Sequence, residues 1–241
     1  MPIRANALAV MAKAPIAGRV KTRLVPFLTA GQAAELARAL LLDQLEHLSA
    51  VESADLYLAF APPEEETLMR RLAPARFEIF PQSDGDLGAR MQNIFARLFA
   101  QGYEAVALIG ADLAPVPLEY FAEAFKYLDG ERSPIHPSLS KVEREGFSGA
   151  QDRAVLGPSK DGGYYLIGLN RPLPEIFADM TWSHNRVFAQ SLARLRELRV
   201  ATRTLPPWFD IDTPDDLKNF ADFLDESQKA PMKHSLPLLR R

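Results

Sequence analysis

The sequence of 241 residues contains no cysteine. This absence excludes a disulfide framework, a thiolate metal site and a cysteine nucleophile, and it fits a protein of the reducing cytoplasm. The four histidines include no ligand-spaced cluster, so a zinc site has no support. A Gly-x-Ser-x-Gly elbow is also missing, because residues 146–149 read Gly-Phe-Ser-Gly and only approach it.

The sequence also lacks long hydrophobic runs and an excess of positive charge. Its longest apolar stretches, residues 7–12 and 105–109, are far shorter than the roughly 18–20 residues that cross a bilayer, so we expect no membrane span. Lys and Arg total 28 against 31 Asp and Glu, a net charge of −3. Such a chain has no overall basic field for nucleic acid, and an anion-binding site must therefore be local.

Strand and helix patterns alternate along the chain. With 47% hydrophobic residues, the sequence is long enough for one substantial core, and a single domain over residues 1–225 is predicted. The alternation predicts a three-layer α/β/α sandwich around a mixed, mainly parallel sheet. The predicted strands are residues 7–12, 55–61, 77–80, 105–109, 155–158, 164–169 and 200–205, and the predicted helices are 29–48, 64–72, 87–100, 117–128, 183–198 and a last one from 213.

Two segments interrupt this alternation. Residues 129–152 are rich in Gly, Pro, Ser and charge without a sustained period, which is long for a connection inside a domain. They are interpreted as a mobile lid or a disordered insertion. Residues 226–241 combine Lys, Pro and His without an apolar stripe, so we expect a loosely held tail.

A basic loop follows the first predicted strand. It carries four cations in eleven residues, Lys13, Arg19, Lys21 and Arg23, and Gly18 lies among them. Ligands bind at the carboxyl ends of strands in open α/β sheets, where Lys and Arg neutralise phosphate and glycine lets the backbone approach. The loop matches neither the Walker pattern nor the dinucleotide glycine triplet. It is interpreted as a phosphate site, with a solvated basic loop as the alternative.

Three aspartates follow predicted strands. Asp112 comes directly after residues 105–109, and Asp210 and Asp212 lie beyond residues 200–205, on one side of an extended segment. Mg²⁺ or Mn²⁺ takes one or two carboxylates together with substrate phosphate oxygens. These aspartates are therefore the candidate metal ligands, although Asp112 alone would also suit a turn in which it accepts backbone N–H groups.

The segment Asp161-Gly162-Gly163 precedes two tyrosines. Adjacent glycines permit a ligand to lie against the main chain while Asp161 binds its hydroxyl groups. A simple Asp-Gly turn between two strands is the alternative. Tyr164 and Trp182 are candidates for lining the substrate site, against the alternative of core or rim packing.

The order of these motifs resembles a bacterial family assigned as glycosyltransferases, with the type-A fold of the nucleotide-diphospho-sugar transferase superfamily. The resemblance extends over residues 6–224. The sequence is also similar to two nucleotidyltransferases of the same superfamily, molybdopterin guanylyltransferase and phospholactate guanylyltransferase. The motifs that carry it are Met11-Ala12-Lys13-Ala14-Pro15, residues 18–24, Gly110-Ala111-Asp112-Leu113, Gly157-Pro158, residues 161–169, Trp182-Ser183 and Asp210-Ile211-Asp212-Thr213-Pro214.

The resemblance implies roles for particular residues. Lys13, Arg19, Lys21 and Arg23 would contact nucleotide phosphates, and residues 82–88, which include Gly85 and Gly88, would lie near the base or ribose. Asp112, Asp212 and Asp210 would hold the divalent metal. The sequence departs from the family at His184, where a small hydroxyl residue is more usual, and in residues 129–152, an insertion that is longer than usual. Asp112 also stands alone, whereas many type-A glycosyltransferases have an Asp-x-Asp motif.

Three functions compete. The leading hypothesis is a glycosyltransferase that uses a nucleoside diphosphate sugar, Mg²⁺ or Mn²⁺, and an unidentified small-molecule acceptor, with Lys21 and Asp161 as the catalytic candidates and Asp161 as general base. A nucleotidyltransferase that acts with a nucleoside triphosphate on a phosphorylated metabolite is the second. A non-catalytic nucleotide-binding module is the third.

Overall fold

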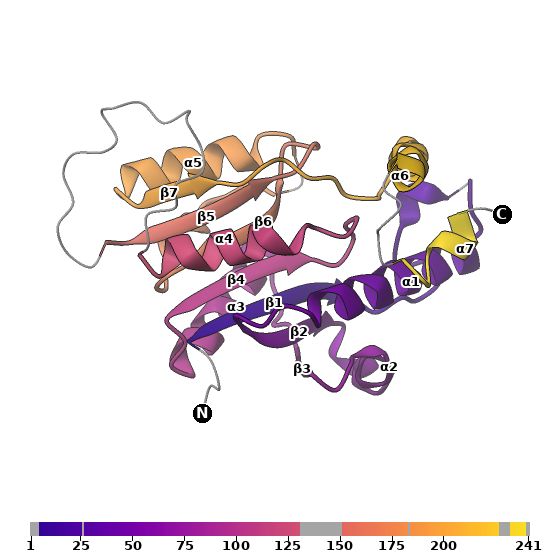
Figure 1. Cartoon of the computed structure of the whole chain (residues 1–241), viewed down its shortest axis with the longest axis horizontal. Coiled ribbons are helices and arrows are strands. Elements are labelled where there is room, and N and C mark those ends of the chain that lie inside the picture. The colour runs from indigo at the N-terminus through magenta and orange to yellow at the C-terminus, as the bar shows by residue number, and fades with distance from the viewer. Residues whose placement is uncertain (1–4, 26, 131–150, 183, 227–231, 240–241) are drawn as a thin grey trace.

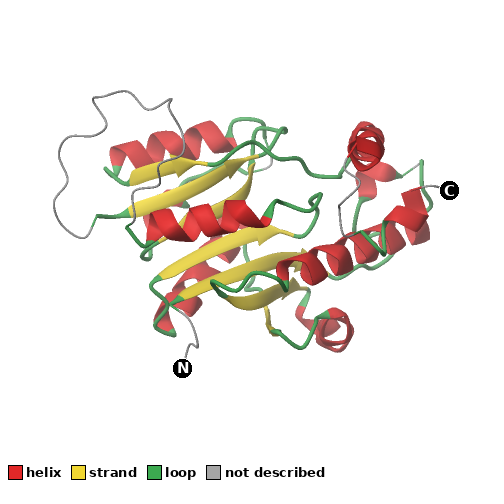
Figure 2. Cartoon of the chain, in the orientation of Figure 1, coloured by secondary structure: helices red, strands yellow, loops and turns green. Residues whose placement is uncertain are grey.

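The computed structural model describes residues 5–25, 27–130, 151–182, 184–226 and 232–239. In these residues a seven-stranded sheet lies between two layers of helices, as Figure 2 shows. The predicted three-layer sandwich is therefore confirmed. Most of the insertion, residues 131–150, lies outside the described residues.

The strand order across the sheet is β3-β2-β1-β4-β6-β5-β7 (Figure 1). β6 runs antiparallel to both of its neighbours, and the other strands pair in parallel, which confirms a mixed, mainly parallel sheet. Six strands therefore end at the same edge of the sheet. The strands are β1 Asn6–Lys13, β2 Asp55–Ala61, β3 Phe77–Pro81, β4 Ala105–Gly110, β5 Arg153–Pro158, β6 Tyr164–Leu169 and β7 Ala201–Thr204.

Alternate residues of each central strand bury against different helix layers. Leu8 and Val10 of β1 face a core shared with α1, α2 and α4, whereas Ala7 and Ala9 face a core shared with α3 and α5. Burial on both faces is the reason for the unbroken apolar run in this strand. The helices are α1 Ala30–Leu48, α2 Glu66–Leu72, α3 Leu87–Ala100, α4 Leu118–Leu128, α5 Val187–Glu197, α6 Pro214–Glu226 and α7 Leu236–Leu239.

Local signals set where several helices begin. Thr29 and Gln32 form the predicted capping box at the start of α1. The helix that was predicted from residue 183 begins only at Val187. The backbone N–H of Phe188 donates to the Gly162 carbonyl at 2.9 Å, and the N–H of Arg186 donates to Nδ1 of His184 at 3.0 Å. The first contact joins the start of α5 to the β5–β6 turn, and the second is a local contact in the residues that precede the helix.

The described part of the tail is anchored on α1, alongside which α7 lies in Figure 1. The buried carboxylate of Asp43 accepts hydrogen bonds from the backbone N–H groups of His234 at 2.9 Å and Ser235 at 2.8 Å, and from the Ser235 hydroxyl at 2.6 Å. Met232 is buried beside α1 and α6. Residues 232–235 are thus held by specific contacts, in contrast to the loose tail expected from composition. In the part of the chain that the structure describes, no helix is both long and apolar enough to cross a membrane.

Replacement of Asp43 by alanine should lower the free energy of unfolding by about 1–3 kcal/mol, because three donors lose their acceptor and those that stay buried are left unsatisfied. Urea unfolding followed by circular dichroism measures this change. Glu46→Gln is the matched control one turn along α1, since its exposed ion pair with Lys233 contributes little. Equal midpoints for the two variants would contradict the anchoring role of Asp43.

Candidate functional site

The basic loop leaves the carboxyl end of β1 in a defined conformation. The backbone N–H of Ala14 donates to the Ala61 carbonyl at 2.8 Å, which ties the loop to the end of β2. Val20 and Leu24 are buried, so the loop is packed onto the domain on both sides of Lys21. Lys21 itself has φ 49° and ψ 35°, the left-handed region that non-glycine residues rarely adopt. This conformation directs the loop into the short 3-10 helix Thr22–Leu24.

Main-chain pairing brings two of the predicted aspartates together. Leu113 and Asp210 form an isolated antiparallel bridge, and the N–H of Ile211 donates to the Asp112 carbonyl at 2.9 Å. The start of α6 fixes the far end of this segment, because the Asp216 carboxylate accepts from the N–H groups of Asp212 at 3.1 Å and Thr213 at 2.8 Å. Two segments a hundred residues apart in sequence therefore present their carboxylates to one point.

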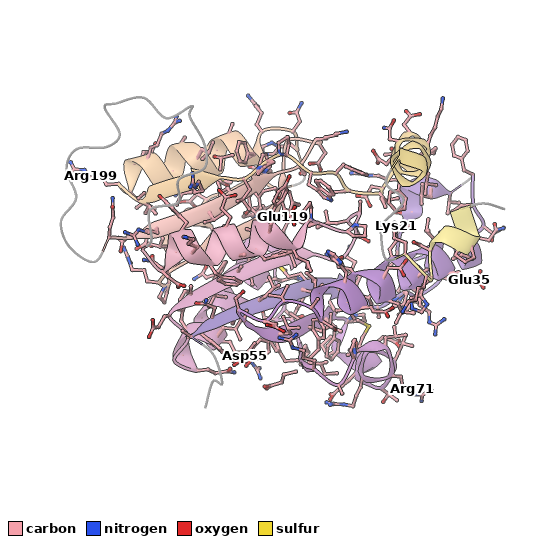
Figure 3. All side chains as sticks on the ribbon, in the orientation of Figure 1. Lys21, Glu35, Asp55, Arg71, Glu119 and Arg199 are labelled. Carbon is pink, nitrogen blue, oxygen red and sulfur yellow. The ribbon has the colours of Figure 1, made fainter. Side chains whose placement is uncertain are left out.

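Lys21 occupies that point. Its Nζ lies 2.7 Å from Oδ1 of Asp112 and 2.9 Å from Oδ1 of Asp212. The Lys21 side chain is 1% exposed, whereas the two carboxylates are 59% and 41% exposed. Burial lowers the pKa of Lys21, but the two carboxylates more than offset this effect and raise it above its ordinary value. Figure 3 shows Lys21 between the carboxyl edge of the sheet and α6.

Asp210 adds a third negative charge nearby. Burial, together with the neighbouring carboxylates of Asp161, Asp212 and Asp112, raises the pKa of its carboxyl to about 7, whereas Lys21 acts in the opposite direction. The four aspartates therefore share one electrostatic neighbourhood in which Lys21 is the nearby cation.

The Asp161-Gly162-Gly163 segment forms the tight turn between β5 and β6. Asp161 accepts from the Ser159 hydroxyl and, through Oδ1, from the N–H of Gly163 at 2.9 Å. Gly162 has φ 88°, and a side chain there would overlap the backbone carbonyl of Asn185. The turn thus explains why Asp161 and Gly162 occupy these two positions. It also holds the Asp161 carboxylate in a fixed, exposed position.

A cleft of about 630 Å³ opens at the same edge of the sheet. Its lining includes many of the residues predicted for the site: Lys13, Arg19, Lys21, Arg23, Gly85, Asp112, Tyr164 and Asp212. The other predicted residues lie outside this lining: Gly18, Gly88, Asp161, Gly162, Gly163, Trp182 and Asp210. The cleft therefore unites the basic loop with the carboxylate pair, whereas residues 159–163 of the β5–β6 turn are not part of its lining.

Trp182 has a structural position. Its ring lies 6.4 Å from that of Phe177, centroid to centroid, and covers the Cα of Gly88, where a Cβ would come within 2.6 Å of the indole. Gly88 is thus explained by this close approach at the start of α3. The indole N–H of Trp182 is buried without a hydrogen-bond partner among the described residues, so packing on Gly88 accounts for the ring but not for its N–H.

Two cleft residues were not singled out from the sequence. Gln82 is buried and donates through Nε2 to the carbonyls of Ala12 at 3.3 Å and Ala59 at 2.8 Å, so it ties β1 to β2 below the cleft. Arg90 lines the cleft, and its Nε donates to the Gly85 carbonyl at 3.0 Å. Gln82 belongs to residues 82–88, the segment that the resemblance places near the base or ribose. Arg90 belongs to no recognised motif, so no signal in the sequence pointed to it.

The donor set at Lys21 suits a small divalent cation. No group of three or more His, Asp or Glu side chains arranged to hold a metal occurs among the residues that the structure describes. Asp112 and Asp212 nevertheless converge on one cation beside the cleft. Mg²⁺ commonly takes one or two carboxylates together with substrate phosphates, so this pair fits such an ion, while the predicted third ligand, Asp210, does not complete a set of three.

Comparison with protein families supplies a match over more than half of the chain. Residues 44–184 match the family described as "Uncharacterized protein conserved in bacteria (DUF2064)". The chain belongs to this family. Comparison with curated proteins gives no match.

Solved structures share the fold over nearly the whole chain. A protein from Desulfovibrio desulfuricans G20, provisionally named a nucleotide-diphospho-sugar transferase, is 28% identical with a TM-score of 0.83, and the match covers 99% of this chain and 95% of that one. A cytidylyltransferase from Leptospira borgpetersenii is 10% identical, with a TM-score of 0.59 and coverage of 98% and 93%. The 4-diphosphocytidyl-2C-methyl-D-erythritol synthase of Anaerococcus prevotii is 10% identical, with a TM-score of 0.56 and coverage of 92% and 97%. The chain thus has the nucleotide-diphospho-sugar transferase fold, which these transferases share.

The raised pKa of Asp210 makes stability depend on pH. Unfolded Asp210 loses its proton near pH 3.8 and folded Asp210 near 7, so the folded state binds more protons between these values and stability falls as pH rises through them. Asp210→Asn should therefore be more stable than the unaltered protein at pH 8, by roughly 2–4 kcal/mol, and similar to it at pH 4. Denaturant unfolding in EDTA at both pH values measures the difference. A constant difference between pH 4 and pH 8 would argue against a buried, repelled carboxyl.

Proposed function

We propose that the protein is a transferase that binds the diphosphate of a nucleoside diphosphate sugar in the cleft and passes the glycosyl group to a small-molecule acceptor. One observation carries the proposal: the cleft joins a loop of exposed cations to a converging pair of carboxylates. A metal-bound diphosphate needs both, because its oxygens attract cations while its metal attracts carboxylates. The relative from Desulfovibrio desulfuricans supports this assignment through its name and its 28% identity.

The basic loop would hold the phosphates. Lys13, Arg19 and Arg23 are exposed side chains that line the cleft. Their charges would neutralise the diphosphate and stabilise the negative charge that develops on it as the glycosyl bond breaks. Gly85, with φ 108°, lines the cleft opposite this loop and offers backbone to the nucleoside.

Asp112 and Asp212 would hold the divalent ion, Mg²⁺ or Mn²⁺. When bound there, such an ion would act as a Lewis acid on the departing diphosphate. Both carboxylates are partly exposed to the cleft, and the backbone of each is fixed by the pairing of residues 112–113 with 210–211. The pair is thus held in place before any ligand arrives.

Asp161 is our candidate for the acceptor side. Its carboxylate is exposed, acts electrostatically on Asp210, and is oriented by the Ser159 hydroxyl and the Gly163 N–H. An oriented, hydrated carboxylate can accept a proton from an acceptor hydroxyl, the role of a general base. Tyr164, which lines the cleft from the first position of β6, would contact the sugar.

A nucleotidyltransferase is the second candidate. Cytidylyltransferases share the fold, and β4 is followed by the single Asp112 instead of two spaced aspartates. The same loop cations would neutralise a triphosphate. The products separate the two functions, because a glycosyltransferase releases a nucleoside diphosphate and a nucleotidyltransferase releases pyrophosphate.

The test is a panel of nucleotide sugars and nucleoside triphosphates with Mn²⁺, read first by thermal shift and then by product release. A true ligand at a hundredfold excess over its Kd stabilises the protein by about 2.7 kcal/mol. Asp112→Asn should lower kcat/KM for the selected substrate at least about 100-fold, a loss of roughly 2.7 kcal/mol in transition-state stabilisation.

Asp215→Asn is the matched control, because this exposed aspartate lies three residues beyond Asp212 in the first turn of α6. It should retain the activity of the unaltered protein. Stabilisation by a nucleotide without any product would favour a binding module, and an Asp112→Asn variant of normal activity would exclude the proposed metal site.

A further inference from the structure

Lys21 differs from the other cations of its loop. Lys13, Arg19 and Arg23 are exposed and form none of the ion pairs found among the described residues. Lys21 is almost fully buried and touches two carboxylates from separate segments. Four cations in one short loop therefore divide into three that face solvent and one that is already neutralised.

The position of Lys21 is built into the fold. Burial of an unpaired ammonium is very costly, and here Asp112 and Asp212 compensate it at 2.7 and 2.9 Å. The backbone of Lys21 adopts the left-handed conformation, which costs energy for a side-chain-bearing residue and persists only where the surroundings impose it. The ammonium is thus held at the point where the two carboxylates converge.

A divalent cation and this ammonium compete for the same oxygens. Lys21 contacts Oδ1 of each carboxylate, so a metal held by the same two carboxylates would lie beside the ammonium, and two cations within about 3 Å repel each other. Metal binding therefore requires Lys21 to leave the pair. A displaced ammonium needs another anion, and the cleft that Lys21 lines is where our proposed function places the diphosphate.

We infer that Lys21 is the counter-ion of the Asp112–Asp212 pair when no metal is bound. A metal can then bind the two carboxylates only when a diphosphate binds the Lys21 ammonium in their place. The inference rests on the proposed function, since it assumes a metal-bound diphosphate as the ligand. Lys21 thereby selects the metal–diphosphate complex over free metal. Linkage requires the reverse as well: the metal promotes diphosphate binding by the same factor.

Mn²⁺ binding without any nucleotide tests this inference, measured by the loss of the free Mn²⁺ signal in electron paramagnetic resonance. Lys21→Gln should bind Mn²⁺ at least tenfold more tightly than the unaltered protein, because its carboxylates have no competing cation. Lys13→Gln is the control, since it removes a loop charge of the same kind without touching the pair, and it should leave Mn²⁺ affinity close to that of the unaltered protein. Equal or weaker binding by Lys21→Gln would overturn the inference.

A second measurement uses the unaltered protein, in case Lys21→Gln does not fold. The ¹H–¹⁵N signal of the Lys21 ammonium, assigned by its loss in Lys21→Arg, should shift when Mg²⁺ and pyrophosphate are added together and stay in place with Mg²⁺ alone at the same concentration. An equal shift with Mg²⁺ alone would contradict the conditional role.

Failure of the inference and failure of the proposed function give different results. The binding measurements require no transfer reaction, so a positive result stands even if no substrate is turned over. If Asp112→Asn abolishes Mn²⁺ binding in the presence of pyrophosphate while Lys21→Gln does not strengthen binding in its absence, the metal site stands and only the counter-ion role is wrong. If Asp112→Asn leaves Mn²⁺ binding with pyrophosphate intact, the metal site and the inference built on it both fail.

Discussion

The contact of Lys21 with Asp112 and Asp212 is the interaction on which the organisation of the site depends. It joins the loop after β1, the loop after β4 and the segment before α6. Each of these is tied to its neighbour by main-chain hydrogen bonds, so the three charges meet without help from a ligand. The two ion pairs offset part of the mutual repulsion of the aspartates, whereas burial is the largest cause of the raised pKa of Asp210, to which the carboxylates of Asp161, Asp212 and Asp112 also contribute.

Sheet topology explains why the sequence could predict much of this arrangement. β1 and β4 are adjacent and parallel, so residues that follow them must lie at one edge of the sheet. The basic loop and Asp112 were recognised by their positions after buried strands, and the structure brings both to the cleft. The strands were also predictable, because runs buried on both faces have few other interpretations.

Other features depend on contacts that no local pattern encodes. Asp212 reaches Asp112 through a bridge between segments that are distant in sequence. Lys21 was expected to contact nucleotide phosphates, but its ammonium is paired with carboxylates. The left-handed backbone of Lys21 and the near-complete burial of its side chain accompany this pairing, and neither can be read from the local sequence. Trp182 was a candidate for substrate binding by residue type alone, but it packs on Gly88. The start of α5 also involves a tertiary contact, because the N–H of Phe188 in its first turn donates to the Gly162 carbonyl in the β5–β6 turn.

On the mechanism proposed above, one site accommodates a metal and a diphosphate because Lys21 exchanges its carboxylate partners for a phosphate oxygen. A crystal structure of the protein grown with Mn²⁺ and pyrophosphate, with anomalous data at the manganese edge, would show this exchange. We expect an anomalous peak bound by Asp112 and Asp212, with Nζ of Lys21 on a pyrophosphate oxygen. A manganese ion bound elsewhere, or pyrophosphate bound in the cleft while Lys21 still lies between both aspartates, would contradict this mechanism.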